Sequence, residues 1–202
     1  WKPVRRTYVP KANGKWRPLG IPGWSDKLVQ EVIRMVLEAY YEPIFLKQSH
    51  GFRPNRSCHT ALIQIKKAWT GVTWFVEGDI QSCFDEIDHN TLLDVLGRRV
   101  RDFRFLKLVR TMLEAGYWEN ETHHKTIAGT PQGGIISPLF ANVFLHELDD
   151  YVLNTLKPAF DKGEERRRNP EYAEMHNAYR RAKGRGDKET ALAYKRRRNQ
   201  LP

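Results

Sequence analysis

The sequence predicts an α+β fold with a basic C-terminal extension that is either helical or disordered. The chain has 202 residues, of which 40% are apolar, so it is long enough to bury a sizeable core. Segments with helical apolar spacing mix with a few strand-like segments without regular alternation, which disfavours a doubly wound sheet. Beyond Pro158 the apolar pattern gives way to clusters of arginine.

The first third of the chain predicts a hairpin followed by two helices. Residues 7–21 contain Asn13-Gly14 between two strand-like runs, a strong hairpin signal. A helix is predicted to begin at Ser25 and to stop at Pro43, and Ser57 is the expected cap of a second helix.

The middle of the chain predicts a buried strand and then a mainly helical region. Residues 73–80 are largely apolar and end at Asp79 and Ile80. The elements expected after this strand are helices over about 91–100 and 103–115 with caps Asn90 and Asp102, a strand pair within 117–127, and a helix from Ser137 to about Thr155.

The charge of the chain is concentrated at its two ends. The formal net charge is +10, and the sequence pI is about 9.7. Residues 1–17 carry six Lys or Arg and no acid, and residues 157–202 carry 14 basic and 7 acidic residues. This distribution predicts an anionic partner such as nucleic acid, held at the periphery of a packed core. For residues 158–202 two alternatives remain: charged helices, or a segment that folds only on RNA.

Two cysteines, Cys58 and Cys83, form no disulfide framework and match no metal-ligand spacing. A reducing compartment such as the cytoplasm is therefore expected. The apolar runs are too short to span a bilayer, so no membrane partner is expected. The chain begins at Trp1 and ends at Pro202 within a polar stretch, and we expect it to be part of a longer protein.

Asp79 is the residue that most directly suggests chemistry. A carboxylate at the end of a buried strand can hold a divalent cation for phosphoryl transfer, and the Ile80 carbonyl lies beside it in sequence. Taken alone, Asp79 fits a helix cap or a surface aspartate better than a metal ligand. Asp85, Asp88 and His89 lie where the chain bends from strand to helix, so turn and cap bonding is expected of them.

Several segments accompany Asp79 and change its interpretation. They are the basic hairpin Pro10–Pro22, the loop Gly51–Pro54, the run from Asp79 itself to Phe84, and the glycine loop Gly129–Gly134. Together they resemble the conserved blocks of reverse transcriptases. Their sequences are most similar to those of group II intron reverse transcriptases, also called maturases. The similarity covers about residues 4–157 and implies the fingers and part of the palm of a right-hand polymerase. The expected divisions are fingers over 1–72, partial palm over 73–157 and an arginine-rich insertion over 158–202.

The resemblance also implies roles for individual residues. Asp79 corresponds to the first catalytic aspartate and would bind Mg²⁺ together with the Ile80 carbonyl. Phe84 resembles the aromatic residue that crowds the 2′ position of the incoming nucleotide and so excludes ribonucleotides. Each residue also has a plainer explanation. Asp79 fits a helix cap or a surface position, and Phe84 fits an ordinary core position.

The other implied contacts are with the nucleotide and the template. Lys11 and Arg17 correspond to fingers residues that neutralise the triphosphate, and Gln132 to a glutamine that lies against the nucleotide. Arg53 is similar to a template-side contact. A strict two-residue loop at Asn13-Gly14 would place Lys11 and Arg17 on opposite faces of the hairpin, so their convergence requires a longer loop or a bulge.

A polymerase of this family needs a second carboxylate pair, supplied by a Tyr-x-Asp-Asp hairpin that this chain lacks. Asp149-Asp150 is interpreted as the exposed face of a helix, and the hairpin is expected beyond Pro202. The 202 residues alone are therefore expected to be inactive. The resemblance implies intron RNA as template, a DNA primer and deoxynucleotides as substrates. The alternatives are a retron or diversity-generating reverse transcriptase, or a non-catalytic RNA-binding splicing factor.

Overall fold

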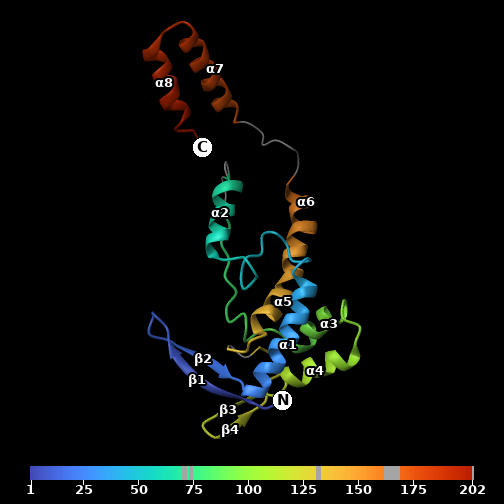
Figure 1. The fold of residues 1–202 in the computed structure, drawn as a ribbon. Helices are drawn as coiled ribbons and strands as arrows, with labels where there is room; N and C mark the ends of the chain where they lie inside the picture. The colour runs from blue at the N-terminus through green and yellow to red at the C-terminus, as the bar shows by residue number, and fades with distance from the viewer. Residues whose placement is uncertain (70–71, 73–74, 131–132, 162–168, 202) are drawn as a thin grey trace. The chain divides into compact units, whose positions relative to one another are not determined.

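The computed structural model describes residues 1–69, 72, 75–130, 133–161 and 169–201 (Figure 1). The chain divides into two units, Trp1–Leu156 and Lys157–Pro202. This boundary lies one residue from the predicted start of the arginine-rich insertion at 158. The predicted division between fingers and palm at 72/73 lies inside the first unit and stays a prediction.

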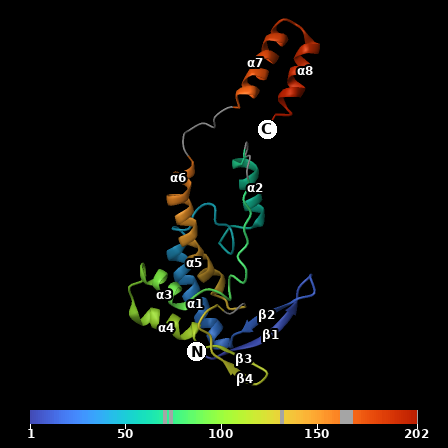
Figure 2. The same ribbon diagram turned by 180° about the vertical axis from the view of Figure 1, so that it is seen from behind.

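The first unit contains a four-stranded sheet in the order β2-β1-β3-β4. Its strands are β1 (Val4–Pro10), β2 (Trp16–Ile21), β3 (Tyr117–Glu119) and β4 (Thr122–His124). Antiparallel pairing joins β1 to β2 and β3 to β4, and a short parallel contact joins β1 to β3. The predicted N-terminal hairpin and the predicted strand pair are both present, and Figure 2 shows them as one sheet from behind.

The loop of the first hairpin has three residues rather than two. The Lys11 amide donates to the Lys15 carbonyl at 2.7 Å, and Gly14 has φ 78°. A left-handed glycine at the end of a three-residue loop matches a common hairpin turn. Because Val9 pairs with Arg17, this register places Lys11 and Arg17 on the same face of the hairpin.

Four helices enclose the core of the first unit: α1 (Trp24–Tyr41), α3 (His89–Gly97), α4 (Phe103–Leu113) and α5 (Ser137–Tyr151). Helices α1 and α5 run side by side in both views. The most deeply buried side chains of this core are Leu37, Tyr41, Ile87, Leu92, Leu96, Val109, Ile136, Phe140 and Val143.

Side-chain caps begin three of the helices in the first unit. Ser57 and Thr60 form a capping box at the start of α2 (Cys58–Ala68), and Asp102 caps α4, as predicted. The prediction that Asn90 caps α3 is wrong. Asp88 takes that place because its carboxylate accepts the Thr91 amide at 2.7 Å, and this bond lowers the pKa of Asp88.

The prediction of a buried strand over 73–80 is wrong for the residues that the structure describes. Residues 75–80 have no regular secondary structure, and the Phe75 and Val76 side chains are 63% and 93% exposed. Apolar composition alone does not make a strand, because its backbone needs a neighbouring strand to pair with. The described sheet gives this segment no partner.

The end of the first unit and the described part of the second unit are helical. Helix α5 continues as a π-helix η1 (Val152–Leu156), and the second unit comprises α6 (Lys157–Phe160), α7 (Pro170–Gly184) and α8 (Lys188–Arg198). Between α7 and α8 the Arg198 guanidinium lies 5.5 Å from the Tyr172 ring and 5.6 Å from the Tyr179 ring. Within the described ranges, no helix has the length and apolar character needed to cross a bilayer.

Candidate functional site

The glycine loop joins the segment after Asp79 through its backbone. The amide of Gly129 donates to the Ile87 carbonyl at 2.7 Å, and the amide of Thr130 donates to the Phe84 carbonyl at 2.7 Å. Gly129 has φ 89°, and a Cβ added there would lie 2.8 Å from the Asp85 carbonyl oxygen. The close approach therefore depends on glycine.

The other end of this loop approaches the N-terminal hairpin. A Cβ added to Gly133, which has φ 109°, would lie 2.8 Å from the Gly20 carbonyl oxygen at the end of β2. Two residues later, the amide of Ile135 donates to Oε1 of the buried Gln30 at 3.0 Å. The glycine loop thus brings together three segments that the sequence singled out: the hairpin, the region around Phe84 and the loop itself.

Replacing Gly133 by alanine is expected to lower the free energy of unfolding by roughly 1–3 kcal/mol, the cost of one residue held in a rarely populated backbone conformation. The matched control is Gly78→Ala, because a Cβ at Gly78 meets nothing within 4 Å and its φ is not left-handed. Urea unfolding of the two variants measures the difference. Equal midpoints would show that the loop relaxes at no cost.

The cations of the hairpin divide between its two faces. Arg5, Lys11, Lys15 and Arg17 share one face, are exposed, and form no ion pair with any described residue. Arg6 lies on the opposite face, 3.4 Å from the Tyr117 ring centroid and 3.9 Å from a Glu119 carboxylate oxygen. The first face therefore offers unneutralised positive charge to an anion.

Asp79 and Ile80 lie in the irregular segment, and both are exposed. In the described part of the chain, no group of three or more His, Cys, Asp or Glu side chains is arranged to hold a metal ion. The donors nevertheless suit Mg²⁺, which prefers oxygen and is usually held by one or two carboxylates together with substrate phosphates. Gln132 falls outside the described residues.

Arg53 is buried, and its guanidinium is occupied. Its side chain is 4% exposed and forms a bidentate ion pair with the Glu42 carboxylate, with N–O distances of 3.0 and 2.8 Å. Nη1 also donates to the carbonyls of Leu46 and Ser49 at 2.7 and 2.8 Å. A template contact requires an accessible guanidinium, and in this arrangement the Arg53 guanidinium is not accessible. The template role of Arg53 stays a prediction.

Phe84 is half-buried and packs against the hydrophobic core. Its ring meets the ring of Phe52 edge to face, with centroids 6.4 Å apart and an interplanar angle of 80°. No sequence pattern assigned a role to Phe52 or to Glu42, the partner of Arg53. Neither residue carries a signal in sequence, because each contact joins positions more than ten residues apart.

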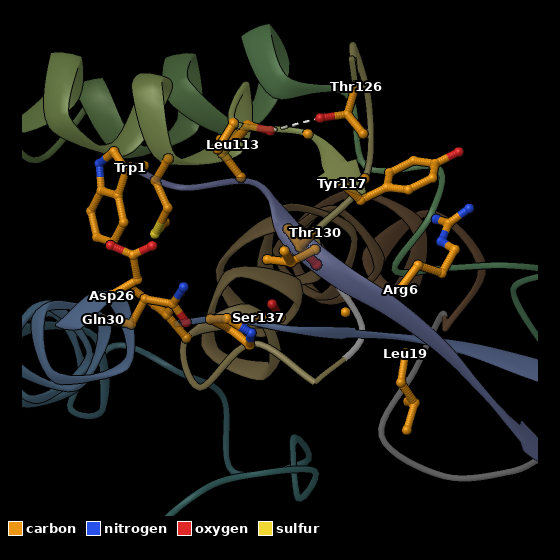
Figure 3. Close-up of a pocket in the computed structure, with 18 of the residues that line it drawn as sticks. Trp1, Arg6, Leu19, Asp26, Gln30, Leu113, Tyr117, Thr126, Thr130 and Ser137 are labelled. Atoms are coloured by element: carbon orange, nitrogen blue, oxygen red, sulfur yellow. Dashed lines mark hydrogen bonds between the residues drawn. The ribbon is translucent and has the colours of Figure 1, made fainter. Parts of the chain in front are cut away.

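A cavity of about 350 Å³ lies beside these residues, lined by the hairpin, α1, α4, β3 and the glycine loop. Figure 3 shows Arg6, Gln30, Thr130 and Ser137 around it. Its lining includes Gly20, Asp85 and Gly129 but not Asp79, Lys11, Arg17 or Phe84. The cavity therefore adjoins the predicted nucleotide site and does not coincide with it.

Two pairs of adjacent residues, one of histidines and one of aspartates, lie on regular elements of the first unit. His123 packs on Trp118 and His124 stacks on Tyr117, so the two histidines point to opposite faces of β4. Asp149 and Asp150 lie in α5, where Asp150 is exposed and Asp149 is half-buried. Partial burial raises the pKa of Asp149.

Comparison with known proteins agrees with the sequence motifs. The reverse transcriptase (RNA-dependent DNA polymerase) family matches residues 9–162. The chain is 51% identical to the group II intron-encoded protein LtrA of Lactococcus lactis over 209 aligned residues, which cover 100% of this chain and 35% of LtrA.

Two further relatives are encoded by or named for introns. An uncharacterized 91 kDa protein in the cob intron of Schizosaccharomyces pombe is 49% identical over 90% of this chain and 23% of its own length. Nuclear intron maturase 1 of Arabidopsis thaliana is 36% identical over 46% of this chain and 13% of its own length. The chain spans about a third of LtrA and less of the other two. The chain therefore belongs to the reverse transcriptase family, in the group that contains the group II intron-encoded proteins.

Proposed function

We propose that this chain forms the nucleotide-binding part of an RNA-directed DNA polymerase of a mobile group II intron, acting in the cytoplasm of a bacterium. The observation that carries the proposal is the meeting of three motifs: the glycine loop bonds to Phe84 and Ile87 on one side and approaches Gly20 of β2 on the other. The exposed cationic face of the same hairpin supports it.

In this proposal each residue performs one part of nucleotide binding. Lys11 and Arg17 neutralise the triphosphate, and Gln132 lies against the nucleotide. Phe84 occupies the space next to the sugar and excludes a 2′-hydroxyl. These roles suit nucleotidyl transfer, because the reaction depends mainly on positioning of the reactants and on stabilisation of charge.

Asp79 would hold Mg²⁺ together with the Ile80 carbonyl. The bound cation would supply neutralisation of the charge that develops on the phosphate oxygens. Because one carboxylate provides part of a two-metal site, the remaining carboxylates of the full-length protein complete it in this proposal. The substrates are deoxynucleotides and a DNA primer, with intron RNA as template.

The arginine-rich second unit is proposed to bind the intron RNA. Helices α7 and α8 place Arg180, Arg181, Lys195, Arg196 and Arg197 on a small helical hairpin, and none of these side chains pairs with an acid among the described residues. Phosphate contacts of this kind supply sequence-independent affinity. This binding would support a maturase role in splicing.

Lys11→Ala and Arg17→Ala are each expected to raise the KM for deoxynucleotides in the full-length protein by roughly tenfold or more, about the value of one charge-assisted contact. Lys15→Ala is the matched control because it removes a cation from the same face without an assigned role. Steady-state primer extension at varied nucleotide concentration measures all three. An equal rise for Lys15→Ala would indicate a general charge effect.

A non-catalytic splicing factor is the second candidate, because the basic helices α7 and α8 would serve RNA binding equally well without any catalysis. RNA-templated, Mg²⁺-dependent primer extension by the full-length protein separates the two. The polymerase proposal predicts extension by the full-length protein and none by the 202 residues alone. Intron RNA binding without any extension by the full-length protein would favour the splicing factor.

A further inference from the structure

Phe52 is an unusual residue in its surroundings. Its side chain is 69% exposed, although phenylalanine gains free energy from burial, and its backbone adopts φ 52°. A left-handed conformation is uncommon for a bulky residue and persists only where the surrounding structure enforces it. An exposed aromatic ring held in a strained backbone conformation calls for a role other than packing.

The loop around Phe52 is anchored on both sides of this residue. The Gly51 carbonyl accepts a hydrogen bond from Nδ2 of Asn142 on α5 at 2.8 Å. On the other side, buried Arg53 is fixed by Glu42 and by the carbonyls of Leu46 and Ser49. The loop therefore has little freedom to relax the strain at Phe52. The anchors at Gly51 and Arg53 fix the backbone of Phe52 and so the direction in which its side chain leaves the backbone.

The ring of Phe52 is directed at Phe84. The centroid distance of 6.4 Å and the angle of 80° are those of a favourable edge-to-face pair. Among the described residues this is the one ring-to-ring contact of Phe84. The backbone of Phe84 is held separately, since its carbonyl accepts the Thr130 amide at 2.7 Å. Backbone and core packing thus fix one side of Phe84, and Phe52 limits the movement of its ring on the other.

We propose that Phe52 is a specificity-determining residue that holds the Phe84 ring in position and thereby sets how strongly ribonucleotides are excluded. The inference rests on the proposed function of Phe84 as the residue beside the sugar. Phe52 acts through Phe84 and is a positioning residue. The buried Arg53 supports both, because it fixes the loop that carries Phe52.

The test is the ratio of kcat/KM for a ribonucleotide to that for the matching deoxynucleotide, measured by primer extension with the full-length protein. Phe52→Ala is expected to raise this ratio roughly three- to tenfold, the change that corresponds to loss of one aromatic pair. Phe52→Tyr keeps the ring edge and is expected to restore the wild-type ratio. Phe103→Ala, which removes a ring that is 77% exposed at the start of α4, is the matched control and leaves the ratio unchanged.

A double-variant cycle separates this role from a contact with the template. In a Phe84→Ala background, Phe52→Ala is expected to change the ratio no further, since the two residues act as one unit. An unchanged ratio in Phe52→Ala, or an equal rise in both backgrounds, would overturn the inference while leaving the polymerase proposal intact. Absence of any extension by the wild type would instead overturn the proposed function. If Phe52→Ala unfolds, Phe52→Leu with its melting temperature recorded takes its place.

Discussion

Asp79→Asn in the full-length protein is expected to lower Mg²⁺-dependent primer extension by about 10³-fold, the upper range for removing one group that stabilises transition-state charge. Asparagine keeps the size and polarity of the side chain but removes the negative charge that a divalent cation requires. Because Asp79 is exposed and lies outside regular secondary structure, its loss is not expected to disturb the fold. Affinity for intron RNA should remain close to that of the wild type.

The matched control for this variant is Asp94→Asn, which neutralises an exposed carboxylate on α3. Single-turnover extension and RNA binding are measured for both variants. Asp94→Asn should behave as the wild type in both assays. If Asp79→Asn loses RNA binding together with extension, Asp79 has a structural role and the metal assignment fails.

Arg53→Met is expected to reduce the free energy of unfolding by about 3 kcal/mol, the lower end of the range for breaking a buried ion pair. Methionine fills part of the space but leaves Glu42 and the carbonyls of Leu46 and Ser49 without their donor. The lower end applies because the Glu42 side chain is 31% exposed and stays partly hydrated. Urea unfolding of the 202-residue chain measures the change.

Arg98→Ala provides the comparison, because Arg98 pairs with Glu147 at the surface, with side chains 62% and 45% exposed. A surface pair of this kind contributes less than about 1 kcal/mol. Similar losses in the two variants would mean that burial does not strengthen the Arg53 interaction. The loop that carries Phe52 would then be less firmly anchored than proposed.

Much of the fold could be predicted because its signals are local. A capping residue acts within one turn, so Ser57 and Asp102 identified the starts of α2 and α4. Asn13-Gly14 correctly marked the first hairpin, but its three-residue loop depends on how the whole hairpin pairs. That register decides whether Lys11 and Arg17 share a face, and their spacing alone left the question open.

What could not be predicted concerns interactions between distant residues. The apolar run at 75–80 suggested a strand, but a strand also needs a pairing partner, and the local sequence says nothing about one. The family resemblance implied a template-side contact for Arg53, and that role stays a prediction. The ion pair of Arg53 with Glu42, eleven residues away, could not be predicted because nothing in the sequence links the two. The same holds for Phe52 and Phe84, which only the folded chain brings into contact.

Metal rescue of Asp79→Cys in the full-length protein tests the central claim most directly. A thiolate binds Mg²⁺ poorly but binds the softer Cd²⁺ well, so the cation requirement should follow the ligand at position 79. We expect this variant to be inactive with Mg²⁺ and to regain primer extension when Cd²⁺ is added, whereas Asp79→Ala stays inactive with either metal. Undiminished extension by Asp79→Cys or Asp79→Ala with Mg²⁺ alone would contradict the assignment of Asp79 as a metal ligand.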